Sequence, residues 1–157
     1  MMNAQFTFFL LAILAVTLVW IAIQDIRTFT ISDRLNLAIA VIAPVFWWSA
    51  GVAFWPDGAI RIGVAVVVFL LFAAMFYIGA MGGGDVKLAG ALALWFPPMG
   101  TVKMLVLMSI AGGLLTLIVM WRHKSTKNEG RPEVPYGVAI AFGALWLLAE
   151  RFLNHFA

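Results

Sequence analysis

The sequence contains no cysteine and very little charge. Among its 157 residues there are only seven Asp or Glu and ten Lys or Arg, whereas 64% of the residues are hydrophobic. The absence of cysteine excludes disulfides, thiolate metal sites and a cysteine nucleophile. Charged residues make up only 11% of the chain. This excludes an ordinary soluble domain, because such a domain covers its surface with far more charged side chains.

What the sequence has instead is six long runs without an acidic or basic residue. A helix needs about 20 residues to cross a bilayer core of about 30 Å, and fewer where flanking side chains reach the interface. We therefore expect an all-α, polytopic membrane helical bundle with about six transmembrane helices, built as a single domain over residues 1–157. The runs cover residues 1–24, 35–56, 62–84, 88–102, 104–121 and 134–149.

The connections between these six expected spans differ in positive charge. The first, third and fifth connections carry seven Lys or Arg, against three on the opposite side. Because basic loops stay in the cytoplasm, we expect these three connections there and the N-terminus outside. The fourth span is short and contains two prolines, but six crossings keep the most basic connections on one side. The seven cations are Arg27, Arg34, Lys87, Arg122, Lys124, Lys127 and Arg131, and the three are Arg61, Lys103 and Arg151.

Two acids, Asp25 and Asp85, fall on the same side of the membrane in this topology. Asp25 follows the first uncharged run and Asp85 follows the third, so two crossings separate them. An ionisable carboxylate at a membrane boundary is costly and points to a functional site. Each acid taken alone also has a simpler interpretation. Asp85 would cap the helix that follows it, and Asp25 would pair with the nearby Arg27.

Three successive glycines, Gly82, Gly83 and Gly84, stand directly before Asp85. Glycine permits backbone conformations that other residues avoid, and it lets another chain approach the backbone closely. We therefore expect an unusual backbone conformation before Asp85, with room for an extended peptide beside the main chain.

Two carboxylates at close range have a defined chemical use. They cannot both ionise, so the pKa of one rises and the pair shares a proton. The ionised partner can take a proton from water that attacks a peptide carbonyl. The protonated partner can polarise this carbonyl and protonate the leaving amine. The chain offers no competing catalytic set: it lacks HExxH, GxSxG and a phosphate-binding glycine loop, and His123 and His155 fall on opposite sides.

The segment Gly82–Leu88, Gly-Gly-Gly-Asp-Val-Lys-Leu, resembles the GxGDxKL signature of the type IV prepilin peptidases, which are GxGD-type membrane aspartyl proteases. All seven positions fit. The segment Asp25–Asn36 is similar to the first-aspartate motif of this family, although Ile31-Ser32-Asp33 replaces the usual Ile-Pro-Asn. We expect Asp33 to cap the second helix. The segment Val134–Ala141, with Pro-Tyr-Gly near its beginning, resembles the start of the last helix in short family members.

This resemblance implies an aspartic-type endopeptidase with Asp25 and Asp85 as catalytic residues, supported by Gly82, Gly84 and Lys87. The substrate would be a type IV pilin precursor, cut after a glycine at the cytoplasmic face of the bacterial inner membrane for pilus assembly. Lys87 would face a glutamate of the substrate or a lipid phosphate, or anchor its helix at the interface. Besides the precursor and membrane lipid, we expect no cofactor, no metal and no nucleic acid, and the oligomeric state stays open.

The absence of cysteine refines the resemblance. Full-length prepilin peptidases carry a cytoplasmic N-terminal region with four cysteines, which is associated with N-methylation. This chain has no cysteine and, on our interpretation, no room for that region. It therefore resembles the short, peptidase-only type (TadV/CpaA-like) that serves tight-adherence (Flp) pili. The expectation is cleavage of the leader without methyl transfer.

Three alternatives remain at this stage. A presenilin-like intramembrane protease shares the glycine–aspartate motif, but its first acid lies in a Tyr-Asp pair, which is absent here. A cation- or proton-transporting membrane protein would use the same carboxylates as ion ligands. Transporters, however, tend to place acids near the membrane midplane and to have two related halves. A purely structural membrane protein leaves the glycines before Asp85 without a purpose.

Overall fold

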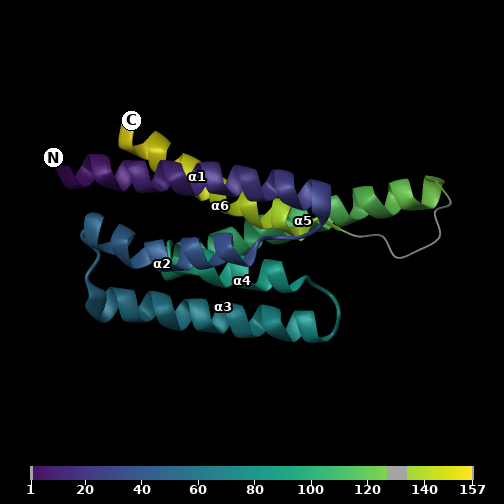
Figure 1. Ribbon diagram of the computed structural model, residues 1–157, viewed down its shortest axis with the longest axis horizontal. Coiled ribbons are helices and arrows are strands. Elements are labelled where there is room, and N and C mark those ends of the chain that lie inside the picture. Colours follow the sequence, from purple (N-terminus) through teal and green to yellow (C-terminus); the bar gives the residue numbers. More distant parts are fainter. Residues whose placement is uncertain (1, 127–133, 157) are drawn as a thin grey trace.

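Long apolar helices dominate the computed structural model, which describes residues 2–126 and 134–156. In this part of the chain every regular element is helical, which confirms the predicted all-α membrane bundle (Figure 1). The six α-helices are α1 (Met2–Thr28), α2 (Asp33–Ser49), α3 (Ala59–Tyr77), α4 (Gly83–Ala93), α5 (Pro98–Thr126) and α6 (Tyr136–Phe156), and a short π-helical turn, η1 (Phe54–Gly58), precedes α3.

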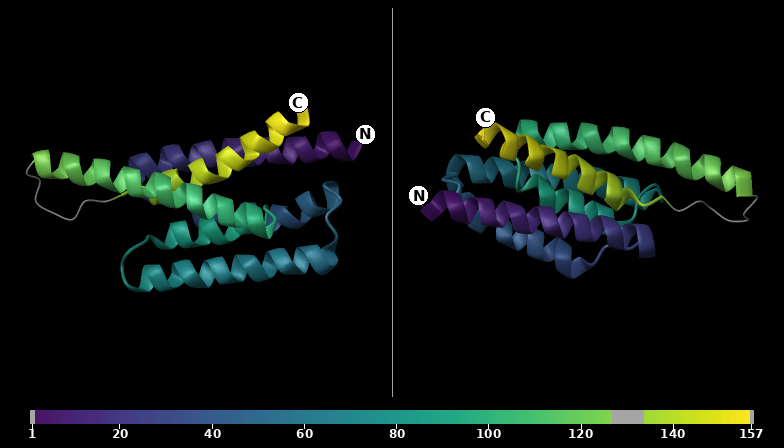
Figure 2. Two further views of the ribbon diagram at one scale, coloured as in Figure 1. Left: turned by 180° about the vertical axis from the view of Figure 1, so that it is seen from behind. Right: turned by 90° about the horizontal axis from the view of Figure 1, so that it is seen from above.

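Five helix ends lie together at one end of the bundle. There α1 and α3 end, and α2, α4 and α6 begin, on the right in Figure 1. Both chain termini lie at the opposite end. Helix α5 starts partway along the length of the bundle and projects beyond the other helices at the first end, as Figures 1 and 2 show. This first end, which carries Asp25 and Asp85, is called the aspartate end below.

Four helical segments are long and apolar enough to cross a membrane. Helices α2 and α4 are not among them, because their 17 and 11 residues rise only about 25 Å and about 16 Å at 1.5 Å per residue. The expectation of about six transmembrane helices is therefore correct for the number of helices in the described residues, but only four have the length of a span. These four are Ala4–Thr28, Phe54–Tyr77, Pro98–Lys124 and Tyr136–Leu153.

The segment 88–102, expected as the fourth span, is divided between two helices. Helix α4 ends at Ala93 and α5 begins at Pro98. The cause is the pair Pro97-Pro98, because proline cannot continue a helix and restricts the residue before it. Helix α5 then runs back toward the aspartate end (Figure 1). The third and fifth connections consequently share one end although α4 is too short to cross. Lys127 and Arg131 of the fifth connection lie outside the described residues.

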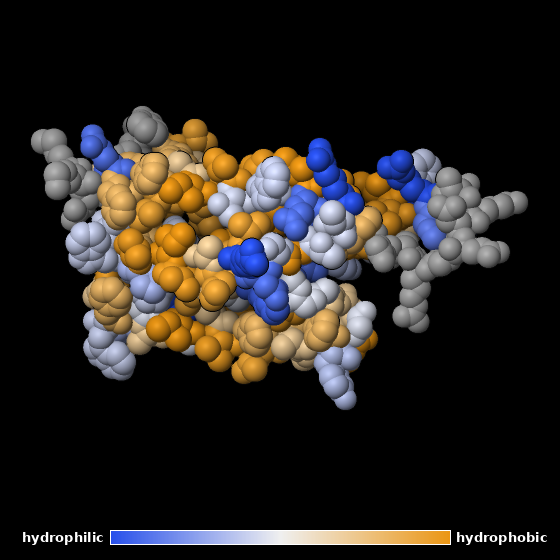
Figure 3. Space-filling view, viewed as in Figure 1, coloured by the Kyte–Doolittle hydropathy of each residue, from blue (hydrophilic) through white to orange (hydrophobic). Residues whose placement is uncertain are grey.

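Helix α4 lies at the centre of the bundle. It contacts α2, α3, α5 and α6, and its residues from Asp85 to Ala93 are buried except for Lys87. Small side chains make this possible: a Cβ atom added to Gly90 would lie 3.3 Å from the Cβ atom of Phe69. The outer surface is different. Figure 3 shows that apolar side chains cover most of the visible face, as expected where the surrounding solvent is lipid.

Candidate active site

Asp25 occupies the last position of the buried stripe of α1. Leu11, Leu14, Leu18 and Ile21 are each at most 2% exposed, and Asp25 follows at the same three- and four-residue spacing with 3% exposure. This spacing keeps all five side chains on one face of the helix. The apolar stripe therefore directs the carboxylate into the bundle. Arg27 is exposed, because residues two apart do not share a helix face.

The first turn of α6 holds the Asp25 carboxylate. The backbone N–H of Val138 donates a hydrogen bond to Asp25 Oδ2 over 3.3 Å. A helix N-terminus supplies unpaired N–H donors and a favourable dipole for a negative charge. Gly137 makes the approach possible: a Cβ atom on this residue would lie 2.8 Å from Asp25 Oδ2 and 2.7 Å from Ile31 Cδ1. Any side chain at this position would displace the carboxylate.

Gly137 is a site residue that the sequence interpretation missed. A glycine at the start of an apolar span is more simply explained by close helix packing. The available signal was its place in Pro135-Tyr136-Gly137, directly at the expected start of the last helix. Helix N-termini are the usual sites for binding anionic groups. Nothing in the one-dimensional pattern, however, relates this start to Asp25, which lies 112 residues earlier.

Asp85 is the third residue of α4, and its carboxylate folds back over the beginning of the same helix. Asp85 Oδ2 accepts a hydrogen bond from the backbone N–H of Gly82 over 3.3 Å, and Gly82 is the residue that caps the helix. The simpler interpretation of Asp85 as a capping residue is thus confirmed as geometry. It is compatible with catalysis, because only one oxygen is engaged in this bond.

The glycines before Asp85 are needed for space and not for an unusual backbone. Gly82 has φ −75° and ψ 146°, an extended conformation open to any residue, and Gly83 and Gly84 are helical. The expected special conformation is therefore wrong. Close approach, in contrast, is observed at Gly82 and Gly84. An added Cβ atom would lie 2.9 Å from Asp85 Oδ2 at Gly82 and 3.0 Å from Ile31 Cβ at Gly84.

Both aspartates line one hollow at the aspartate end, with a volume of about 510 Å³. Burial raises the pKa of Asp85 to about 7, the charge of Asp25 acts in the same direction, and the Gly82 N–H opposes both. The two carboxylates are thus close enough to influence each other's charge. The remaining lining is Thr28, Phe29, Thr30, Gly79, Ala80, Met81, Gly82, Val134 and Tyr136.

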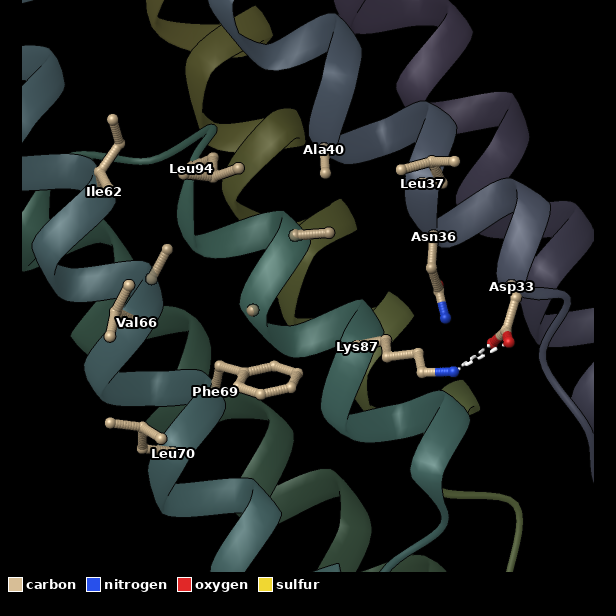
Figure 4. A pocket seen from close by; sticks show the side chains of 13 residues that line it. Asp33, Asn36, Leu37, Ala40, Ile62, Val66, Phe69, Leu70, Lys87 and Leu94 are labelled. Carbon is tan, nitrogen blue, oxygen red and sulfur yellow. Dashed lines mark hydrogen bonds and ion pairs between the residues drawn. The ribbon is translucent and has the colours of Figure 1, made fainter.

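Lys87 lies on a different side of α4 and does not line the aspartate hollow. Its Nζ atom is 2.8 Å from both carboxylate oxygens of Asp33 (Figure 4). Asp33 begins α2, where Ser32 is the capping residue without a side-chain cap bond; the expected capping role of Asp33 is therefore wrong. The pair stands at a second, apolar hollow between α2, α3 and α4, of about 570 Å³. In this hollow Asn36 Nδ2 donates a hydrogen bond to the carbonyl oxygen of Gly84.

The remaining polar residues considered from sequence lie away from the aspartate hollow. Asp57 is part of η1, at the opposite end of the bundle (Figure 1). His123 is in the last turn of α5, and the side chain of His155 lies outside the described residues. Among the side chains that the structure describes, no three His, Asp or Glu are grouped as ligands of a metal ion.

The fold and the site together define a class: a helical integral membrane protein with two buried carboxylates in one hollow. Comparison with known families makes this specific. The family model for type IV leader peptidases matches residues 12–120, which include both Asp25 and Asp85. The chain therefore belongs to the type IV leader peptidase family, whose members are proteases that act on leader peptides. No curated protein and no solved structure matches the chain.

Proposed function

We propose that this protein is an aspartic-type endopeptidase in which Asp25 and Asp85 are the catalytic pair. The observation that carries the proposal is that α1 and α4 bring two carboxylates, 3% and 8% exposed, into one hollow. Buried carboxylates without a cationic partner are costly, so they concentrate at functional sites. The family gives the reaction class, which is hydrolysis of a peptide bond.

The environments of the two carboxylates support a division of roles. Asp85 has a raised pKa, about 7, and holds the shared proton. Asp25 accepts the Val138 N–H at the start of α6 and carries the negative charge. In the proposed reaction Asp25 takes a proton from water as the water oxygen bonds to the peptide carbonyl carbon, and Asp85 donates its proton to the carbonyl oxygen. When the C–N bond breaks, the leaving amine takes up the proton held by Asp25. One of the two hydroxyls of the intermediate returns its proton to Asp85 and becomes the carbonyl oxygen of the new carboxylic acid, so that both aspartates regain their starting states.

The proposed substrate is a pilin precursor, cut after a glycine on the cytoplasmic side of the bacterial inner membrane. The family match supports a leader peptide as substrate. Positive charge supports the orientation, because Arg27, Arg34 and the last turn of α5 all lie at the aspartate end. The preference for a tight-adherence type of pilin rests on the resemblance to the short, cysteine-free members of the family.

The test is processing of candidate pilin precursors co-expressed with this protein. Wild type is compared with Asp25→Asn and Asp85→Asn, and the mature N-terminus is read by mass spectrometry. We expect cleavage after glycine by wild type and a loss of about 10²–10⁴-fold in either variant, because each removes one partner of the proton transfer.

Asp57→Asn is the matched control, since it makes the same change at the opposite end of the bundle. It should leave processing unchanged. If both Asp25→Asn and Asp85→Asn still cut at the wild-type rate, the proposed pair is wrong. If wild type cuts none of the precursors but carries protons or cations in liposomes, the transporter interpretation replaces the peptidase.

A further inference from the structure

A lateral groove opens between α3 and α5 beside the aspartate hollow. Its volume is about 610 Å³. It exists because α3 packs mainly on α4 and α5 mainly on α6, so that the two helices make little contact with each other. The groove is lined by Phe72 and Met75 of α3, by Met108, Ser109, Gly112, Gly113, Thr116 and Leu117 of α5, and by Ala80, Met81 and Tyr136.

The groove and the aspartate hollow adjoin each other. Ala80, Met81 and Tyr136 line both of them. Ala80 and Met81 belong to the connection that leads directly into Gly82 and Asp85, and Tyr136 begins the helix that holds Asp25. The end of a chain that lies in the groove is therefore next to the hollow that holds the two carboxylates.

The chemistry of the groove selects an apolar occupant. Among the residues that the structure describes, its lining contains no charged side chain, and the side-chain oxygen and nitrogen atoms there are only the hydroxyls of Ser109, Thr116 and Tyr136. Two of these are already close to each other, with Thr116 Oγ1 3.4 Å from the Tyr136 hydroxyl. A charged leader peptide would lose its solvation here without gaining a partner. An apolar segment would lose nothing relative to lipid.

The shape of the α5 wall selects a helix. Ser109, Gly113 and Leu117 are spaced by four residues, as are Met108, Gly112 and Thr116, so that both rows follow the length of α5. Small residues along such a row allow a second helix to approach closely in a membrane. A Cβ atom added to Gly113 meets no atom within 4 Å. The space on the side of α5 toward which a side chain at position 113 would point is therefore open.

We propose that the α3–α5 groove receives the apolar, membrane-inserted helix of the substrate and presents the peptide bond at its end to Asp25 and Asp85. This inference rests on the proposed peptidase function. In the bilayer the backbone of an apolar segment has to satisfy its own hydrogen bonds, so it lies in the groove as a helix. The chain beyond it extends across Ala80 and Met81 into the aspartate hollow, while its charged leader stays outside.

The first experiment blocks the groove. Gly113→Trp places a large side chain in open space, so it fills the groove without a clash on α5. Gly63→Trp is the matched control, because a Cβ atom on Gly63 of α3 also meets no atom within 4 Å and Gly63 is not part of the groove. We expect cleavage of a pilin precursor to fall about 10²-fold in Gly113→Trp and to stay at the wild-type rate in Gly63→Trp.

The second experiment locates the substrate and does not depend on cleavage. Because the chain has no cysteine, Gly113→Cys or Gly63→Cys provides a unique thiol in the uncleaving Asp85→Asn background. The precursor carries one cysteine in its apolar segment. Oxidation should form a disulfide with position 113 and not with position 63.

The possible outcomes distinguish failure of the proposed groove from failure of the proposed peptidase function. In one outcome wild type cleaves the precursor, Gly113→Trp cleaves it equally well, and no disulfide forms at position 113. This result overturns the proposal that the groove binds the substrate helix; the groove then holds lipid, and the proposed peptidase function stands. If wild type cuts no precursor, the proposed function fails and the groove assignment fails with it. A loss of cleavage in both Trp variants also overturns the groove, since the effect is then not specific to position 113.

Discussion

Helices α4 and α5 follow each other in the chain and are both uncharged over most of their length, but they play opposite structural parts. Helix α4 is short, and all its residues from Asp85 to Ala93 except Lys87 are buried. Helix α5 is 29 residues long and exposes apolar side chains along its length. Nine of these are more than half exposed: Met99, Val102, Val106, Ile110, Leu114, Leu117, Ile118, Met120 and Trp121.

The difference shows what fixes a side chain in a membrane protein. Large apolar residues gain little from burial when the alternative is lipid, so hydrophobicity alone does not draw α5 into the bundle. Helix α4 is central because Ala89, Gly90, Ala91 and Ala93 let four neighbouring helices approach it. Close packing then holds Asp85 in place, whereas α5 is free to form the wall of a groove.

The largest difference between the two helices should appear in their response to loss of a side chain. Leu92 of α4 is fully buried and Leu114 of α5 is 58% exposed. Leu92→Ala leaves a cavity and should lower the free energy of unfolding in detergent micelles by about 2–5 kcal/mol. Leu114→Ala exchanges one lipid contact for another and should change it by less than about 0.5 kcal/mol. Equal losses would show that α5 is packed as tightly as α4.

Adding a methyl group to a glycine should reverse sign between the helices. At Gly84 of α4 the new Cβ atom would lie 3.0 Å from Ile31 Cβ, so Gly84→Ala should destabilise the fold by about 1–3 kcal/mol and reduce cleavage. Gly113→Ala meets open space and should stabilise α5 by up to about 1 kcal/mol through helix propensity. Thermal denaturation and precursor processing measure both effects. A neutral Gly84→Ala would contradict tight packing around α4.

Burial of Asp85 in α4 should be visible in the pH dependence of both stability and cleavage. Its pKa is raised from 3.8 to about 7. An acid whose pKa is higher in the folded than in the unfolded protein favours folding most below its unfolded pKa, here about pH 4. This contribution to the free energy of unfolding is lost as the pH rises through the folded pKa of about 7. If Asp85 is the proton donor, cleavage should fall about tenfold per pH unit above pH 7. Initial rates between about pH 5 and pH 9, with circular dichroism at each pH, test this. A flat profile up to pH 9 would contradict a protonated Asp85.

The smallest effect is expected at the exposed side of α4. Lys87 and Asp33 form an ion pair with side chains 49% and 70% exposed, and such pairs contribute about 0.2–1 kcal/mol. Lys87→Met and Asp33→Asn should each lower stability by no more than this, and the double variant should lose no more than either single one. A double-mutant cycle measures the coupling. If Lys87→Met abolishes cleavage while stability is kept, Lys87 contacts the substrate.

Much of the fold and half of the site follow from local sequence features. Uncharged runs of sufficient length predicted the helices that became α1, α3 and α6, because a bilayer core imposes a length on any helix that crosses it. The two carboxylates were predictable for a related reason, since an acid beside such a run is rare and costly. The glycines before Asp85 were identified as well, although space and not backbone conformation turned out to be their reason.

The remaining features depend on contacts between distant segments. Pro97-Pro98 ends the helix locally, but the place of the short α4 inside the bundle depends on its contacts with four neighbouring helices. Gly137 became a site residue because the start of α6 lies against Asp25. Lys87 met Asp33 across 54 positions of sequence. None of these distances is encoded in a periodic pattern, which reports only on residues within a few turns of the same helix.

The sequence by itself thus determined that this chain is a helical membrane protein, where its charges lie and which two acids are unusual. These properties depend on transfer between water and lipid, which acts on each residue separately. Only the tertiary structure decided that α4 is central, that Asp25 meets the start of α6, and that a groove between α3 and α5 adjoins the aspartate hollow. These properties depend on which helices pack together, and packing is decided by the shapes of all of them at once.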